Sequence, residues 1–155
     1  MIEKIREVEE PFFVDGKIAI PYDYAAGRIA SRFLIELRDN KKIFGLRCSD
    51  CEKVYVPPRS VCKYCFKQLD EWVEVSDKGT LITYTVIYRQ NDAAQPEKIP
   101  FAYGIIQLDG ANTGLVHMLG EVNFNDIKIG MRLQAAFKEE RVASILDIKY
   151  FKPAA

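Results

Sequence analysis

The chain has 155 residues, of which 48% are hydrophobic, 12% aromatic and 28% charged, a composition typical of one medium-sized globular domain or two small ones. The apolar runs are about four residues long, too short to span a bilayer, and the charged N-terminus MIEKIREVEE is not a secretory signal. We therefore expect a cytoplasmic protein that does not insert into a membrane and whose thiols stay reduced.

The formal net charge is zero, but the charges are unevenly distributed along the chain. Residues 28–67 hold ten Lys/Arg and four Asp/Glu, whereas the rest of the chain holds twelve Lys/Arg and eighteen Asp/Glu. A basic segment beside an acidic remainder could steer an anionic partner to one end of the molecule. Solvated faces that differ by chance explain the same numbers equally well.

Two elements are predicted before the first cysteine. In FFVDGKIAI, residues 12–20, Asp15-Gly16 separates two apolar runs, which is typical of a type I′ hairpin. Residues 24–37 read as a helix, with Asp23 as its N-cap and Asp39-Asn40 at its end. The apolar residues that recur there at spacings of three and four are Ala26, Ile29, Ala30, Phe33, Leu34 and Leu37.

All four cysteines lie in CSDCEKVYVPPRSVCKYC, residues 48–65, as two C-x-x-C pairs separated by ten residues. Zinc binds four thiolates tetrahedrally, and each C-x-x-C turn can supply two sulfurs to one ion. The intervening residues are enough for a strand, a turn at the two prolines and a returning strand. The sequence therefore predicts a zinc ribbon with one structural Zn²⁺, bound by Cys48, Cys51, Cys62 and Cys65.

Three other uses of the cysteines fit the pattern less well. Rubredoxin-type iron has the same four sulfur ligands and could replace zinc. A redox C-x-x-C motif needs only one pair, and a catalytic zinc needs an open coordination position that four cysteines do not leave. Ribbon turns often carry glycine after the second cysteine, where φ is positive. Glu52 and Phe66 stand there in this chain, and they could strain the turns or weaken the metal site.

From Trp72 onward the pattern is typical of strands, because β-branched and aromatic residues alternate between turn signals. A loop is expected at 90–101 and a short helical or looped insert near 123–128. Five strands with such an insert predict a small closed barrel of the OB type, although a five-stranded sandwich is also compatible. The predicted strands cover residues 80–89, 102–108, 114–119, 131–138 and 143–150.

The predicted fold class is mainly β with an N-terminal helix, in which a rubredoxin-like zinc ribbon precedes a five-stranded OB-fold barrel. We divide the chain into an N-terminal hairpin and helix (1–41), the ribbon (42–71) and the OB-fold domain (72–155).

The sequence lacks the motifs that are typical of catalytic centres and of loops that bind nucleotide phosphates, so we expect that the protein is not an enzyme. The single histidine, His117, lies in the apolar run GLVHMLG, where a structural role is more common than a catalytic one. OB barrels and zinc ribbons often bind nucleic acid, and Tyr84 and Tyr88 could stack on bases or could belong to the core. The acidic balance of residues 72–155 argues against nucleic acid, which stays the alternative function.

Several runs resemble the acyl-CoA-associated zinc-ribbon/OB-fold family of archaea and bacteria. They are AAGRIASRFLIELRDNKKIFGLRCSDCEKVYVPPRSVCKYC, GTLITYTVIYR, IPFAYGIIQLDGA, DIKIGMRLQAAF and the terminal YFKP, and V-P-P-R and I-G-M are their most specific parts. The resemblance implies an accessory or scaffold protein that joins CoA-thioester enzymes such as thiolase and hydroxymethylglutaryl-CoA synthase. Direct binding of coenzyme A or an acyl-CoA is a further role that the resemblance implies.

The basic segment is compatible with such a ligand, because coenzyme A carries three phosphate groups. The candidate contacts, which could equally dock on an acidic enzyme face, are Arg28, Arg32, Arg47, Arg59 and Lys63. Among them we favour Arg59, which follows the two prolines of the ribbon, although it could instead cap a turn or pair with a carboxylate.

Overall fold

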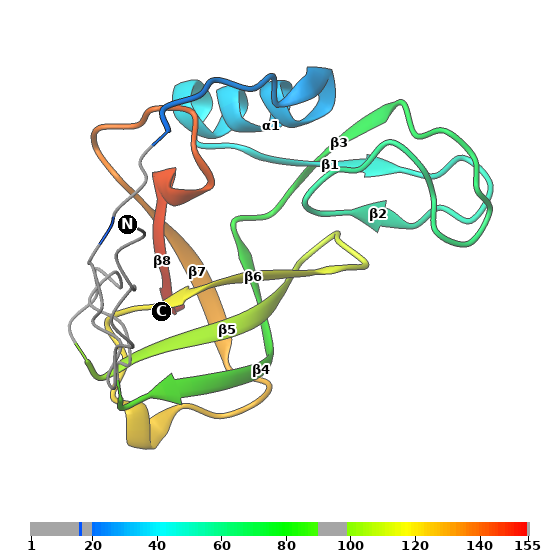
Figure 1. Ribbon diagram of the computed structural model, residues 1–155. Helices are drawn as coiled ribbons and strands as arrows, with labels where there is room; N and C mark the ends of the chain where they lie inside the picture. The colour runs from blue at the N-terminus through cyan, green and yellow to red at the C-terminus, as the bar shows by residue number, and fades with distance from the viewer. Residues whose placement is uncertain (1–15, 17–19, 90–98, 155) are drawn as a thin grey trace, which may run out of the picture.

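The computed structural model describes residue 16, residues 20–89 and residues 99–154, so the predicted hairpin at 12–20 and most of the loop at 90–101 lie outside the described residues. In chain order, a helix is followed by a three-stranded sheet and then by a five-stranded barrel (Figure 1). No helix in the described part of the chain is long and apolar enough to cross a membrane.

The helix α1 covers Gly27–Asn40 and buries Phe33 and Leu37, as the spacing of apolar residues predicts. Its end is set by Lys41, which adopts the left-handed conformation at φ 54° and donates its backbone N–H to the carbonyl of Glu36. The predicted N-cap at Asp23 is wrong, because the N-cap is Ala26. Gly27 has a φ of 78°, which breaks the helical backbone before it could reach Asp23.

The ribbon sheet consists of β1 (Ile43–Arg47), β2 (Val54–Tyr55) and β3 (Glu71–Val75) in the order β2-β1-β3. Both pairings are antiparallel, and β1 pairs with β3 along its whole length. The sheet is closely packed at Gly45, where a Cβ atom would lie 2.7 Å from Val54 Cγ1 and 2.9 Å from the Tyr55 carbonyl oxygen. This close packing holds together β1 and β2, the strands on either side of the first C-x-x-C turn.

The remaining strands form a closed barrel in the order β4-β5-β6-β8-β7, which confirms the OB-type prediction and excludes the sandwich. A 3₁₀ helix at Phe124–Asp126 lies between β6 and β7, where the short insert was expected. Gly79 allows the close crossing of β4 and β5, because a Cβ atom there would lie 2.4 Å from the Gln107 carbonyl oxygen. The strands are β4 (Lys78–Ile87), β5 (Phe101–Leu108), β6 (Gly114–Leu119), β7 (Arg132–Phe137) and β8 (Ile148–Pro153).

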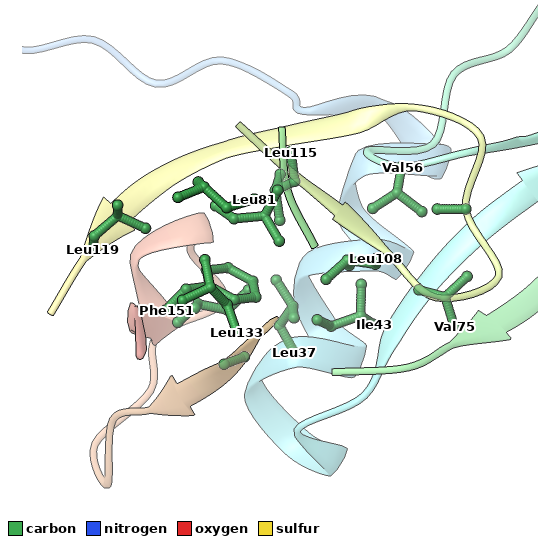
Figure 2. Close-up of a cluster of buried hydrophobic side chains, with 14 of the residues drawn as sticks. Leu37, Ile43, Val56, Val75, Leu81, Leu108, Leu115, Leu119, Leu133 and Phe151 are labelled. Carbon is green, nitrogen blue, oxygen red and sulfur yellow. The ribbon is translucent and has the colours of Figure 1, made fainter. Parts of the chain in front are cut away.

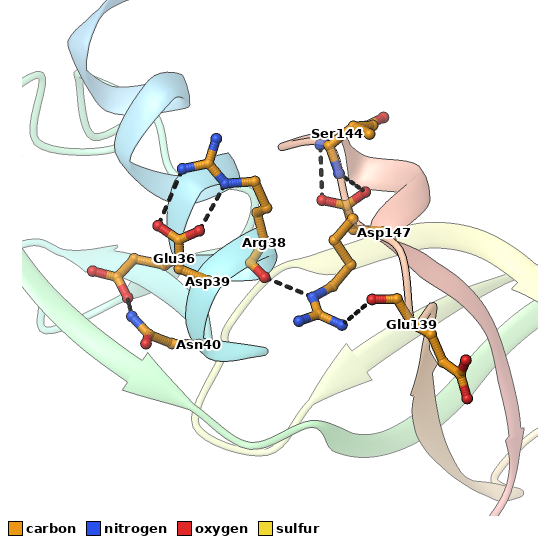
Figure 3. Close-up of polar contacts among 9 residues, drawn as sticks. Glu36, Arg38, Asp39, Asn40, Glu139, Ser144 and Asp147 are labelled. Atoms are coloured by element: carbon orange, nitrogen blue, oxygen red, sulfur yellow. Dashed lines mark hydrogen bonds and ion pairs between the residues drawn. The ribbon is translucent and has the colours of Figure 1, made fainter.

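The last predicted strand, at 143–150, is partly wrong, since a 3₁₀ helix occupies Ile145–Asp147 and β8 begins at Ile148. Ser144 and Asp147 form a capping box there, and the buried Asp147 carboxylate accepts backbone N–H groups of Val142 and Ser144 (Figure 3). These local side-chain bonds compete with strand pairing and delay the start of the strand.

The same corner ties the barrel to the helix. Arg141 Nε donates to the carbonyl oxygen of Arg38 at 2.6 Å, and Arg141 Nη1 donates to the carbonyl oxygens of Lys138 and Glu139. One guanidinium group therefore holds the carboxyl end of α1 against the β7–β8 connection, the region shown in Figure 3.

Helix, ribbon and barrel share one hydrophobic core (Figure 2). Leu37 of α1, Ile43 of β1 and Val75 of β3 lie in the same cluster as barrel residues such as Leu81 and Phe151. A smaller cluster around Tyr55 fills the cysteine end of the ribbon. The continuous core fixes the ribbon relative to the barrel, so surfaces formed by both are structurally defined.

Candidate functional site: a metal centre and a basic groove

The two C-x-x-C turns have the backbone geometry that ribbon metal sites need. In each turn the residue after the second cysteine donates its N–H back to the first, with Glu52 N bonded to Cys48 O at 2.8 Å and Phe66 N bonded to Cys62 O at 3.0 Å. Glu52 and Phe66 have φ values of 56° and 55°, the left-handed conformation that glycine usually occupies. Both turns therefore form without glycine, at the backbone cost expected of a non-glycine residue there.

The four sulfur atoms converge on one point between the turns, all within 4.8 Å of one another. Cys48 and Cys62 are buried, Cys51 is half-buried and Cys65 is exposed. Four cysteine sulfurs at such separations match the tetrahedral donor set of a structural zinc site, and they leave no open position for catalysis. The four residues that come together, Cys48, Cys51, Cys62 and Cys65, therefore fit a structural zinc ion.

A neighbouring hydroxyl group supports the thiolate form of Cys62. The buried Tyr55 hydroxyl lies 3.1 Å from Cys62 Sγ, and the Cys65 N–H donates to the same sulfur at 3.4 Å. Burial raises the pKa of the Cys62 thiol, but these bonds and a further backbone N–H from Tyr64 outweigh it and lower the pKa to about 6. Cys62 is therefore prepared to bind a cation as a thiolate.

Beside the ribbon, a groove of about 640 Å³ opens between the first turns of α1 and the ribbon loop. Three of the five candidate ligand contacts, Arg28, Arg32 and Arg59, line this groove together with Trp72 and Asp70. The size is within the range typical of small-molecule sites. The structure thus brings residues from α1, the ribbon tip and β3 into one basic groove.

Two of these guanidinium groups lie over aromatic rings. Arg32 Cζ is 4.5 Å from the centroid of Trp72, and Arg59 Cζ is 5.1 Å from that of Tyr55. Within the described part of the chain, no carboxylate forms an ion pair with Arg28, Arg32 or Arg59. Arg32 and Arg59 are therefore positioned by cation–π contacts, and the charges of all three arginines are not neutralised by direct pairing.

The start of α1 adds to the positive character of the groove. Its first turn contains no acidic residue, and the N-cap Ala26 provides no side-chain hydrogen bond to the exposed backbone N–H groups. The helix dipole therefore adds to the field of the arginines that line the same opening.

The other two candidates lie outside the groove. Arg47 forms an ion pair with Glu71 on the neighbouring strand at 3.2 Å, and the ammonium group of Lys63 lies 4.7 Å from the centroid of the Tyr64 ring. Sequence reasoning missed Trp72 as the aromatic wall of the groove. Its long-range partner Arg32 lies forty residues earlier, so no local pattern indicates the contact.

The aromatic pair considered for stacking is not part of the core. Tyr84 is 37% exposed and Tyr88 is 63% exposed, so the interpretation of both as core residues is wrong. Tyr88 also lies beyond the end of β4.

His117 is a structural residue. It is buried, its Nε2 donates to the Ile145 carbonyl oxygen at 3.3 Å, and its Nδ1 accepts the Met118 N–H at 2.9 Å. These two bonds fit the neutral ring, and burial lowers the pKa of His117 below the ordinary value of 6.5.

We expect this histidine to make the protein less stable in mild acid. Below about pH 6.5 the unfolded chain binds a proton that the folded chain does not, so the free energy of unfolding falls as pH falls, by at most about 1.4 kcal/mol per pH unit. The fall continues until the lowered pKa of the folded state is reached. Urea unfolding across this range should give a smaller pH slope for His117→Gln than for the wild type; equal slopes would contradict the prediction.

Comparison with known proteins agrees with this geometry. Two adjoining family models match the chain, the rubredoxin-like zinc ribbon domain of ChsH2 at residues 36–70 and the C-terminal OB-fold domain of ChsH2 at residues 72–138. Two curated relatives are each called a DUF35 domain-containing scaffold protein. The one from Methanocaldococcus jannaschii is 28% identical over 123 residues, covering 76% of this chain and 85% of the relative. The one from Pyrococcus furiosus is 25% identical over 111 residues, covering 72% of this chain and 79% of the relative.

Two solved structures share the fold. One is described as an Ltp2-ChsH2(DUF35) aldolase, with a TM-score of 0.61, 24% identity, and coverage of 85% of this chain and 100% of that chain. The other is a DUF35-family protein of unknown function from Sulfolobus solfataricus, with a TM-score of 0.62, 24% identity, and coverage of 83% and 87%. With both ChsH2 domain models matched in order across residues 36–138 and the four cysteines brought together, the chain belongs to the family of ChsH2-like zinc-ribbon/OB-fold proteins.

Proposed function

We propose that the protein is a non-catalytic accessory or scaffold subunit, acting in the cytoplasm, that docks on CoA-thioester enzymes such as thiolase and hydroxymethylglutaryl-CoA synthase. The relatives called scaffold proteins support the general role, and the family resemblance supports this choice of enzymes. The buried histidine and the buried carboxylate in the described part of the chain also support it. His117 and Asp147 are both engaged by backbone hydrogen bonds, which suits a structural role better than proton transfer.

The observation that carries the proposal is the basic groove. The groove is lined by Arg28, Arg32 and Arg59, and it lies beside a four-cysteine metal site that leaves no open coordination position for catalysis. An acidic face of a partner enzyme can meet these charges, and so can the phosphates of coenzyme A or an acyl-CoA held between the two proteins. Arg47 and Lys63 would then act at the margin of the contact, because they lie outside the groove.

Nucleic-acid binding has less support. Tyr84 is exposed on the barrel, as a stacking residue would be, but residues 72–155 hold nine Lys/Arg against ten Asp/Glu. The strand around Tyr84 has no basic residue between Gly79 and Tyr88 to follow a phosphate backbone.

Co-expression with the thiolase and the hydroxymethylglutaryl-CoA synthase of the same genome tests the scaffold role. We expect a complex on gel filtration, and we expect the charge reversal of Arg28, Arg32 and Arg59 to glutamate to abolish it, because three attractive contacts become repulsive. A matched control places the same charge change on the barrel, at Lys78, Lys128 and Lys149.

The control should leave the complex intact. Separate elution of all three wild-type proteins at micromolar concentration, with unchanged enzyme activity, would contradict the scaffold role. Loss of the complex in the barrel control alone would place the docking surface elsewhere.

A further inference from the structure

The second half of β4 is exposed on both of its faces. Side chains along a strand point alternately to opposite sides, so a strand in a barrel wall normally buries every second residue. In β4 the four successive residues 82–85 are all exposed, and two of them are large, with Ile82 at 44% and Tyr84 at 37% exposure. Side chains on both faces of this part of β4 are therefore partly open to solvent.

One edge of the same segment also lacks a partner. β4 pairs with β5 from Gly79 to Ile87, but it pairs with β7 only at Lys78–Thr80. The last backbone bonds on that edge join Leu81 to Met131 and Gly130. Beyond Leu81, within the part of the chain that the structure describes, no backbone hydrogen bond reaches this edge. The amide and carbonyl groups of residues 82–87 that are not directed at β5 therefore face outward.

The neighbouring strands extend the exposed surface. Thr83, Ile105 and Val116 form one row across β4, β5 and β6, and they line a shallow apolar hollow of about 280 Å³ with Tyr103. Val116 is 62% exposed and Tyr103 is 39% exposed. The free edge therefore borders an apolar face.

This surface carries no charge. No Lys, Arg, Asp or Glu occurs in residues 79–87, 101–108 or 114–119, although such residues make up 28% of the chain. Proteins that keep a sheet edge free in solution usually protect it with lysine, proline or a short strand. Between Leu81 and Ile87 the edge of β4 has no lysine and no proline, and its one irregularity is the register shift between Leu81 and Thr83. The residues after that shift have none of these protections, which favours a surface that is covered in the assembled protein.

We propose that this edge, residues 82–87 of β4, pairs with the same edge of a second copy of the chain to form a twofold-symmetric dimer. A twofold axis makes the two β4 strands antiparallel, so each supplies the donors and acceptors that the other lacks. The segment is uncharged, so the two copies meet without like-charge repulsion. Tyr84 and Ile82 of both copies would be buried together at the junction.

The dimer leaves the basic groove open. Figure 1 shows α1 at the top of the molecule and β4 at the bottom, so the groove lined by Arg32 and Arg59 lies away from the proposed interface. A dimer would present two such grooves on opposite sides of its axis. The pairing of β4 is independent of whether the groove binds an enzyme or coenzyme A.

Sedimentation velocity and light scattering at micromolar concentration test the pairing. We expect the wild type to have the mass of a dimer, and Thr85→Lys and Tyr84→Lys to be monomers with an unchanged circular dichroism spectrum, because a lysine at a paired edge brings two like charges together. Val142→Lys is the matched control, since Val142 is 79% exposed and lies outside β4; it should remain a dimer.

Amide exchange provides a second readout that does not depend on a variant. In the wild type, protection of the amides of residues 82–87 from exchange should increase with protein concentration. Protection of the amides in the two C-x-x-C turns should not change. A monomeric wild type, or dimers of both lysine variants with undiminished stability, would overturn the proposal.

Discussion

Replacing Cys62 with serine should release the metal and unfold the cysteine end of the ribbon while the barrel remains folded. Cys62 is fully buried and receives hydrogen bonds from Tyr55 and Cys65, so its sulfur is the most embedded part of the centre. The ribbon end has only a small core of its own, made of Leu46, Cys48, Tyr55, Cys62 and Leu69. A cluster of that size cannot offset the conformational entropy of the two turns, so the metal–sulfur bonds supply the missing stability.

Elemental analysis should give close to one zinc per wild-type chain and almost none for Cys62→Ser. Amide exchange should then be rapid at Glu52 and Phe66, whose N–H groups close the two turns, and slow at barrel residues such as Leu133. Tyr55→Phe is the matched control, because it removes the hydroxyl beside Cys62 and retains all four ligands; it should keep the metal with reduced affinity. A metal-free wild type with protected turns would contradict a structural role for zinc.

The metal centre could be predicted from the sequence because its information is local. The two C-x-x-C pairs indicate both which residues are the candidate ligands and how they are spaced. The positive φ expected after each pair is found at Glu52 and Phe66. Barrel strands could be predicted for a similar reason, since alternation and turn residues are visible within ten positions. Gly114–Leu119, for example, has the bounds that its pattern indicates.

Errors arose where a local bond or a single dihedral angle overrides the pattern. Ser144 and Asp147 follow the spacing of a capping box, so the sequence does indicate that β8 starts late. The strand-like composition of residues 143–150 favoured the wrong prediction. At the helix start, Gly27 adopts a positive φ that glycine alone permits easily, and Asp23 therefore lies too early to cap.

The groove could not have been predicted as a unit, because its walls come from distant parts of the chain. Arg28 and Arg32 are on α1, Arg59 follows the prolines, and Trp72 belongs to β3, which pairs with β1 of the ribbon sheet. Charge counting identified the basic segment, but only the pairing of β1 with β3 brings Trp72 beneath Arg32. The same pairing decides that Arg47 is held by Glu71 and is unavailable to the groove.

If coenzyme A binds directly, Arg59→Ala and Arg32→Ala should each weaken it by about tenfold, the effect of losing roughly 1.4 kcal/mol of charge-assisted bonding at a partly exposed site. The two arginines lie over Tyr55 and Trp72, so their forks are positioned to meet phosphate oxygens in pairs. Affinity should also fall as salt rises, because the Debye length is already ~10 Å at 0.1 M.

Calorimetry with coenzyme A on the isolated protein measures this binding, and Lys128→Ala is the matched control, an exposed cation on the barrel outside the groove. The control should bind as the wild type does. Equal affinity in all variants would remove the groove from ligand binding. If the wild type gives no heat with coenzyme A, direct binding is contradicted, but the scaffold role is not. In that case the groove would bind an acidic face of the enzyme, and the enzyme alone would bind the ligand. The co-expression experiment separates these two results, since charge reversal at Arg28, Arg32 and Arg59 disrupts docking whether or not coenzyme A is present.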